Sequence, residues 1–346
     1  MVSLGYRLTP ENVIPLVNDL KERAKELDYA PKWVFGGTRP VAAVVRDLGF
    51  FDKVFDSTED LDESIAFLRN IERGVDDEYY EDDLIWRVGN KAPYPLLRHH
   101  FGLPSYDETL EGIKTIADSR VLDVISLGPD QNTQQFFFRP DQRDPRMDGA
   151  GGVPVRSIRD FEQLKEASKR GNYPLMRCYS GTADVLKMAE MLKNSINNAW
   201  CAVPLCWYNE LDGRGTRVVE ESVAEAQQLM QWHGEHDIPV EANEPHHWAL
   251  RDSHDALVAA MSYISAYNAK AYGVRNYISQ YMFNVPNMLS FSMDLAKALA
   301  QIELCESLAD DDYNVLRQTR AGLPFLSSDL EIAKGQLAAS TYLQMA

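Results

Sequence analysis

The chain has 346 residues, of which 45% are hydrophobic, so it can form one large domain or a large and a small one. It carries 35 Lys and Arg against 52 Asp and Glu, and the net charge of −17 argues against nucleic acid as a partner. No apolar run approaches the roughly 18 residues of a transmembrane helix, so no membrane partner is expected. The four cysteines lack CxxC spacing and the N-terminus lacks a signal pattern, which predicts a cytoplasmic protein with buried thiols.

Residues 1–74 are predicted to form a small α/β unit. Strands and helices alternate in the order strand 2–6, helix 10–24 with Thr9 as its N-cap, strand 32–35, helix 41–48, strand 53–55 and helix 60–71. This order implies parallel strands joined by right-handed crossovers. Three strands are half of a doubly wound domain, and the first begins directly after Met1, so we expect further sequence or a partner to complete the unit.

Residues 75–93 are acidic and aromatic, which predicts a solvated linker. From 94 onward, six strand-then-helix units predict a TIM-type β/α barrel domain over 94–346. Because a closed barrel has eight strands, this barrel is expected to be incomplete as given. The strands are predicted at 95–101, 121–127, 174–178, 200–208, 238–242 and 276–281, the helices at 106–118, 158–169, 183–193, 218–236, 257–272, 289–308, 313–320 and 329–343, and a long loop at 134–155.

The stretch 200–248 contains the predicted strands and loops that we expect to form the functional mouth of the barrel. It reads as strand, polar loop, helix, strand and polar loop. In a parallel barrel the loops that follow the strands meet at one mouth, where the chemistry takes place. We therefore expect the polar residues of both loops to converge. The candidate catalytic residues are Glu210, Asp212 and Glu244, and the candidate substrate-binding residues of these loops are Tyr208, Asn243, His246 and His247.

Adjacent histidines in an extended segment point in opposite directions, so His246 and His247 are expected to form hydrogen bonds and not to share a metal ion. Glu241 in the preceding strand could be a base, face the barrel interior or lie against a helix.

Arginine and histidine residues end two other predicted strands. Arg98 and His100 end the first barrel strand, and Arg177 ends the third. A guanidinium at a barrel mouth suits a carboxylate ligand. The alternative for Arg177 is a structural ion pair, with Glu210 or Glu241 as its partner.

A glycine pair also follows a strand of the small unit. Gly36, Gly37 and Thr38 could contact a phosphate or nucleotide, or could simply form a turn.

The stretches 2–10, 34–40 and 48–55 resemble the second half of a cobalamin-binding domain. The resemblance implies a partial Rossmann-like unit in which Gly36, Gly37 and Thr38 lie beside the nucleotide tail of the cofactor. In that family an Asp-x-His-x-x-Gly motif supplies the lower cobalt ligand. The motif does not occur in this sequence, so the chain alone is expected to bind cobalamin poorly.

The stretches 175–182, 207–209, 238–245 and 257–281 resemble the large catalytic subunit of glutamate mutase (methylaspartate mutase), a barrel that packs over adenosylcobalamin. The resemblance implies that Arg177 binds a substrate carboxylate and that Tyr208 contacts the substrate. Arg98 and Arg139 are candidates for the other two substrate arginines of the family. The family's catalytic glutamate has no counterpart, because the equivalent region, 200–204, contains no carboxylate.

These resemblances imply an adenosylcobalamin-dependent carbon-skeleton isomerase that acts on a small carboxylic or amino acid. The cofactor would supply the radical chemistry, and the barrel would supply a dry cavity and carboxylate clamps. A corrinoid-dependent methyltransferase barrel and a non-catalytic ligand-binding protein are the alternatives. The expected partners are a small carboxylate and a cobalamin-carrying subunit in an oligomeric assembly.

Overall fold

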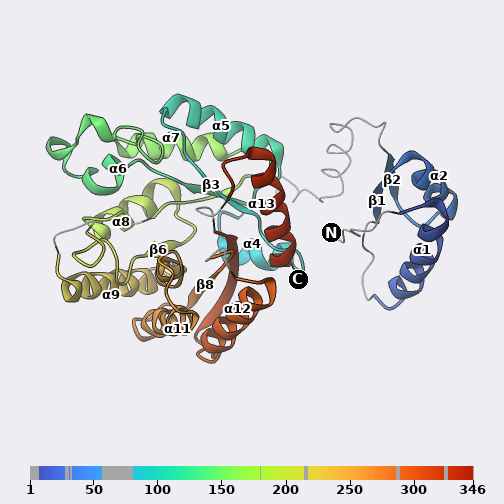
Figure 1. The fold of residues 1–346 in the computed structure, drawn as a ribbon. Coiled ribbons are helices and arrows are strands. Elements are labelled where there is room, and N and C mark those ends of the chain that lie inside the picture. Colours follow the sequence, from blue (N-terminus) through green and yellow to red (C-terminus); the bar gives the residue numbers. More distant parts are fainter. Residues whose placement is uncertain are drawn as a thin grey trace. The chain divides into compact units, whose positions relative to one another are not determined.

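The computed structural model describes residues 8–27, 31, 33–56, 81–179, 181–213, 217–285, 289–322 and 326–345. The chain divides into two compact units, residues 1–78 and 79–346 (Figure 1). All named strands of the described residues pair in parallel. The prediction of a mixed α/β chain with parallel sheets is therefore confirmed.

The described part of the first unit is a two-stranded sheet with two helices. Its elements are α1 (Pro10–Ala24), β1 (Val34–Gly37), α2 (Arg39–Leu48) and β2 (Lys53–Asp56). Thr9 caps α1, because its side chain accepts a hydrogen bond from the amide of Asn12. Val13 and Val17 of α1 pack against Phe35 of β1. The predicted strand 2–6 and helix 60–71 lie outside the described residues.

The second unit begins with a three-stranded sheet in the order β3-β4-β5. Arg98 of β3 pairs with Val124 of β4, which pairs in turn with Leu175 of β5. The elements of this half are α4 (Leu84–Lys91), β3 (Arg98–Phe101), α5 (Tyr106–Ser119), β4 (Val124–Leu127), α6 (Gln131–Phe136), α7 (Ile158–Ser168), β5 (Leu175–Arg177) and α8 (Val185–Ile196).

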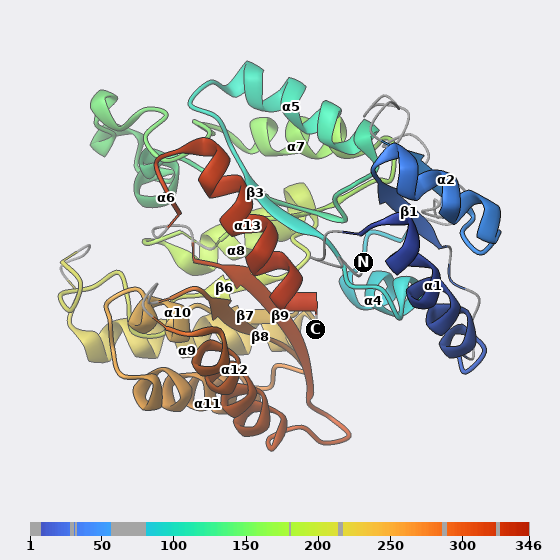
Figure 2. The ribbon, with the colours of Figure 1, turned by 45° about the vertical axis from the view of Figure 1, so that its right-hand side comes forward.

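A four-stranded sheet in the order β6-β7-β8-β9 follows. The helices of the second unit lie around the strands (Figure 2). The elements of this half are β6 (Cys201–Val203), α9 (Val219–Glu235), β7 (Val240–Ala242), α10 (Glu244–Ala249), α11 (Asp255–Ala271), β8 (Asn276–Phe283), α12 (Phe291–Glu306), β9 (Asn314–Ala321) and α13 (Leu330–Met345).

Strand β9 corrects the prediction of a helix at 313–320. Its residues include good helix formers and show no apolar alternation, so local propensity favoured a helix. In the structure all eight residues pair with β8, from Asn276 with Asn314 to Phe283 with Ala321. The tertiary pairing therefore overrides the local preference. The described part of 79–346 thus has seven strands, where six were predicted.

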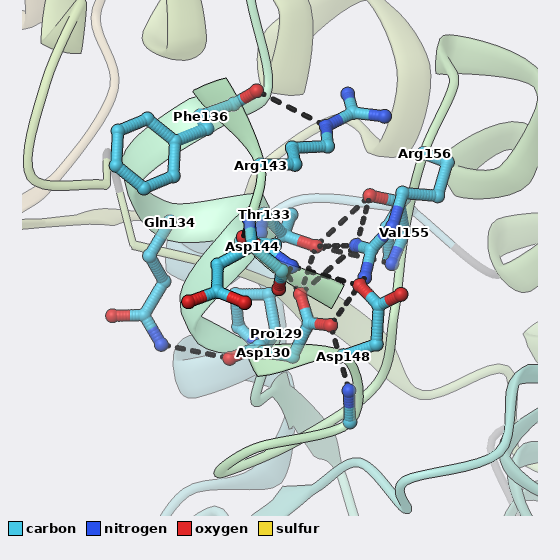
Figure 3. Close-up of polar contacts among 12 residues, drawn as sticks. Pro129, Asp130, Thr133, Gln134, Phe136, Arg143, Asp144, Asp148, Val155 and Arg156 are labelled. Atoms are coloured by element: carbon cyan, nitrogen blue, oxygen red, sulfur yellow. Dashed lines mark hydrogen bonds and ion pairs between the residues drawn. The ribbon is translucent and has the colours of Figure 1, made fainter. Parts of the chain in front are cut away.

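The predicted loop 134–155 is an ordered segment (Figure 3). It contains the end of α6 and the 3-10 helices η1 (Pro140–Gln142) and η2 (Pro145–Met147). Asp130, which is fully buried, accepts hydrogen bonds from the amides of Thr133 and Gly149 at 2.8 and 2.9 Å. Arg156 forms an ion pair with Asp130 at 2.5 Å and another with Asp148.

These contacts decide the charge state of the buried carboxyl. Burial alone would raise the pKa of Asp130, but hydrogen bonds from Arg156, Thr133 and Gly149 hold it below the usual value. A charged carboxylate with this many donors fixes both ends of the segment to each other.

Helix α4 lies within the predicted linker 75–93. Leu84 is buried in an apolar cluster, and Arg87 donates a hydrogen bond to the carbonyl of Tyr173 at 2.8 Å. This part of the predicted linker is thus a packed helix and not a solvated connector. The cluster around Leu84 takes residues from both sheets, namely Val124, Leu175, Trp200, Ile278 and, partly buried, Leu316.

No helix in the described ranges is both long and apolar enough to cross a membrane.

Candidate functional site

The candidate site lies on the strand faces that point away from the surrounding helices. Ile125 of β4 and Met176 of β5 belong to the apolar core with α5, α7 and α8. Because side chains alternate along a strand, their neighbours Ser126 and Arg177 face the opposite side. The same alternation places Arg98, Ser126 and Arg177 on one face of their sheet, and Glu241, Gln280 and Gln318 on one face of the other. These faces meet where Glu241 contacts both arginines, and we call the six residues the polar layer.

Glu241 of β7 is at the centre of this layer and is fully buried. Its carboxylate accepts hydrogen bonds from the indole of Trp200 at 2.8 Å, from Gln280 of β8 at 2.9 Å and from Gln318 of β9 at 3.0 Å. Three neutral donors from three segments therefore fix the position of this carboxylate.

Two arginines of the other sheet also reach Glu241. Arg98 of β3 lies 3.5 Å and Arg177 of β5 lies 3.4 Å from the same oxygen, Oε2. Both guanidinium groups also lie over the ring of Trp200, at 5.6 and 5.1 Å. Burial alone would raise the pKa of Glu241, but the charges of Arg177 and Arg98 lower it, so the carboxylate is charged.

A third arginine, Arg320 of β9, lies within electrostatic range of Glu241 and Arg177. We call Arg98, Arg177, Arg320 and Glu241 the basic cluster. Burial lowers the pKa of Arg98 to about 9, and repulsion from Arg177 adds to this effect. The cluster thus holds three guanidinium groups against a single carboxylate.

Two histidines beside the basic cluster are neutral. Burial and the charges of Arg177 and Arg98 lower the pKa of His100 to about 2. The pKa of His246 also lies well below its ordinary value, because of burial and then repulsion from His247. Neither imidazole therefore adds positive charge at neutral pH, and each can both donate and accept a hydrogen bond.

Several buried polar atoms around the cluster have no hydrogen-bond partner among the described residues. They are Nε and Nη1 of Arg177, Oγ of Ser126, Oε1 of Gln280 and Nδ1 of His246. Buried polar groups in folded proteins are nearly always hydrogen-bonded. Unpaired donors and acceptors on three strands and one helix are therefore the groups that a polar ligand could satisfy.

The second predicted mouth loop, 243–248, is a helix. Asn243 precedes α10, and Pro245 lies in its first turn, where a missing amide hydrogen is tolerated. His246 and His247 are therefore not extended, and their rings stack at 4.6 Å with an interplanar angle of 27°. The premise that the two rings point in opposite directions was wrong.

Glu244 begins α10 and is fully buried. Its Oε1 accepts a hydrogen bond from the amide of Cys206 at 2.7 Å. Burial raises the pKa of Glu244 to about 7, although this amide favours the charged form. Glu244 thus has a pKa suited to proton transfer at neutral pH.

Glu210 and Asp212 accept hydrogen bonds from backbone amides close to them in the chain. Glu210 is exposed and accepts a hydrogen bond from the amide of Val219 at 3.4 Å, and Asp212 accepts from the amide of Asn209 at 3.2 Å. Tyr208 lies edge-on to His247, with ring centroids 6.2 Å apart, and within electrostatic range of Tyr179.

Gly36 and Gly37 are the last two residues of β1 and do not follow the strand as predicted, whereas Thr38 lies between β1 and α2. A Cβ atom at Gly37 would lie 2.7 Å from the ring of Phe35, so a larger residue there would have to displace this ring. A Cβ at Gly36 would meet no atom within 4 Å.

The sequence predictions missed several members of the site: Tyr179, Trp200, Gln280, Gln318 and Arg320. Gln280 had a signal, because a lone amide in the apolar run 277–283 needs a buried partner. Arg139, a candidate from the resemblance, forms an ion pair with Asp184 at 3.0 Å.

No group of three or more His, Cys, Asp or Glu side chains that could hold a metal ion occurs in the ranges the structure describes.

No protein-family model matches this sequence, and no curated protein matches it. Among solved structures, the chain is similar to the arginine decarboxylase of Paramecium bursaria Chlorella virus, with 9% sequence identity. The match covers 88% of this chain and 68% of the decarboxylase, at a TM-score of 0.30. A TM-score this low supports no conclusion about the fold or the activity of this chain.

Replacing the central carboxylate should destabilise the second unit. Glu241→Gln keeps the size of the side chain but leaves Arg98 and Arg177 buried without a counter-charge. We expect a loss of about 3–5 kcal/mol in the free energy of unfolding, measured by urea denaturation. The exposed control Glu190→Gln should change it by less than about 0.5 kcal/mol. A loss below about 1 kcal/mol for Glu241→Gln would show that the arginines do not depend on this carboxylate.

Glu244 should make stability fall as pH rises. Its pKa is about 7 in the folded chain and near 4.5 when unfolded, so the folded state binds the extra proton. This stabilisation is complete below pH 4.5 and is lost as pH rises through about 7. Glu244→Gln mimics the protonated form, so it should match wild type near pH 4.5 and exceed it at about pH 8, by on the order of 3 kcal/mol.

Urea unfolding of Glu244→Gln across this pH range checks the effect, with the exposed Glu210→Gln as control. Parallel pH curves for wild type and Glu244→Gln would contradict a buried, protonated Glu244.

Proposed function

We propose that the two sheets of the second unit curve into one β/α barrel, with the basic cluster inside it. Three observations support this. The cluster around Leu84 contains residues of both sheets. Glu241 contacts strands of both sheets. The amide of Ala199, just before β6, donates to the carbonyl of Met176 in β5 at 3.0 Å, next to the boundary between the sheets.

Within this barrel, the proposed function is to bind and transform a small carboxylic acid. The observation that carries the proposal is the imbalance of charge, three buried or half-buried arginines against Glu241. Unpaired buried charge is costly, and a carboxylate ligand would offset it. A guanidinium matches a carboxylate in shape, and Arg177 still has two unpaired donors.

The proposed reaction is carbon-skeleton isomerisation of a small carboxylic or amino acid, as the resemblance to glutamate mutase implies. Adenosylcobalamin would supply the radical chemistry of such a reaction. The residues of the first unit do not fit the cofactor's lower ligand, because all seven histidines lie at or after His99. A Cβ atom at Gly36 would meet no atom of the described residues within 4 Å. Close packing therefore does not explain why glycine occupies this position. The cofactor would therefore have to come with a partner subunit.

The chain's own residues would then hold the substrate and move protons. Arg98 and Arg177 would orient the acid group, while Trp200 and the neutral His100 would line the site and exclude water. Glu244 would be the general acid or base, because its pKa of about 7 lets it exchange a proton at neutral pH.

A non-catalytic ligand-binding protein is the second candidate. It is favoured by the lack of a carboxylate in 200–204, where the resembled family has its catalytic glutamate. Both candidates need the basic cluster to bind an acid, but only the enzyme needs the proton-exchanging group at Glu244.

Carboxylic acids should stabilise the protein, and Arg177→Lys should weaken their binding. Lysine cannot reproduce the planar fork, so losing a charge-assisted hydrogen bond should lower affinity roughly ten- to hundredfold. Titration calorimetry against small mono- and dicarboxylic acids measures the change. The control Arg139→Lys, in an ion pair outside the cluster, should bind as wild type does. A structural role alone predicts a lower melting temperature for Arg177→Lys with unchanged affinity.

The chain alone should bind adenosylcobalamin more weakly than about 1 µM, because it lacks the histidine that ligates cobalt in the resembled family. A titration followed by the visible spectrum of the corrin measures this. Tight binding with a spectrum typical of imidazole ligation would contradict the expectation and would point to a histidine after residue 98.

A further inference from the structure

Arg320 is the residue of the basic cluster that was hardest to predict from the sequence. It lies on β9 opposite Met282 of β8. Gln318, two residues earlier on the same face, reaches Glu241 at 3.0 Å. The intervening Thr319 is exposed, whereas Gln318 and Arg320 are half-buried. Arg320 therefore points toward Glu241, one step closer to the C-terminal ends of the strands.

Arg320 differs from the other two arginines in its partners. Arg98 and Arg177 lie within 3.5 Å of Glu241 and are held by it. Arg320 makes no hydrogen bond or ion pair with any residue in the described ranges. Its electrostatic neighbours are Glu241 and Tyr179, which attract it, and Arg177, which repels it.

We propose that Arg320 binds the acid group of the ligand directly and makes the site selective for anions over neutral analogues. The inference rests on the proposed binding of a carboxylic acid. Arg98, Arg177 and Glu241 form a fixed frame in which one carboxylate faces two guanidinium groups, which leaves one net positive charge. Arg320 adds a second uncompensated positive charge. Because it lies within electrostatic range of Arg177, it would attract a carboxylate beside the unpaired donors of Arg177.

This assignment predicts opposite effects on stability and binding. In the ligand-free protein Arg320 makes no hydrogen bond or ion pair with a described residue, and burial disfavours its charge more than its electrostatic neighbours favour it, so its removal should not destabilise the fold. The same removal should take away the charge that the ligand needs. A merely structural arginine would behave in the reverse way, with a lower melting temperature and unchanged affinity.

The experiment compares wild type with Arg320→Met, which keeps an unbranched apolar stem but removes the charge, and with Arg320→Lys, which keeps the charge. Arg317→Met is the matched control, because Arg317 lies on the same strand, is exposed and pairs with Glu306 at 2.5 Å. The probes are propionate, succinate and glutarate, each with its neutral amide, followed by titration calorimetry and thermal melting.

For Arg320→Met we expect at least roughly tenfold weaker binding of the acids, equal binding of the amides and a ligand-free melting temperature no lower than that of wild type. Arg320→Lys should recover part of the affinity, and Arg317→Met should bind normally. Affinity of Arg320→Met within about twofold of wild type would overturn the role of Arg320 and leave the proposed function standing. No binding of any acid by wild type would overturn both.

Discussion

The second unit depends on the hydrogen bonds and ion pairs made by the buried carboxylate of Glu241. It accepts hydrogen bonds from Trp200 and from two glutamines of neighbouring strands, and it pairs with Arg98 and Arg177 of the other sheet. No ladder of backbone hydrogen bonds joins the two sheets in the described ranges. Side chains must therefore supply part of the cohesion across their boundaries, and a charged acceptor with several donors does this with defined geometry.

Glu241 is the single carboxylate of the basic cluster and does not balance the charges of its three arginines. A purely structural network would match its charges, because each unpaired buried ion destabilises the fold. Here one carboxylate serves two arginines, and Arg320 has no partner among the described residues. The unpaired atoms of Arg177 and Ser126 lie in the same layer. The protein itself therefore leaves charges and hydrogen-bonding groups of this site without partners. This lowers the stability of the fold, and it is the arrangement expected where a site binds a ligand.

Much of the fold could be predicted from local pattern, and the site only in part. Apolar periodicity placed α5 and α9 within one residue of their observed ends. It failed for β9, because a strand whose inner face carries Gln318 and Arg320 has no apolar alternation to recognise. Arg177 and Glu241 could be proposed as a pair, since each lies in a recognisable strand. Arg320 could not, because its place depends on pairing with β8, which is set by the tertiary fold.

The titrating groups around the site oppose one another in their effect on stability. The pKa values of His100 and His246 are lowered from 6.5, so stability falls as pH drops below 6.5 and the unfolded chain takes up protons. The pKa of Glu244 is raised, so its contribution is lost as pH rises from 4.5 through about 7. As pH rises from 4.5 to 6.5, the histidines increase the stability of the fold while Glu244 decreases it, so the two effects partly cancel. Above pH 6.5 only the decrease in stability caused by Glu244 continues. At pH 7 both imidazoles are neutral and the Glu244 carboxyl is near its pKa, while an acid ligand is fully ionised and complementary to the arginines.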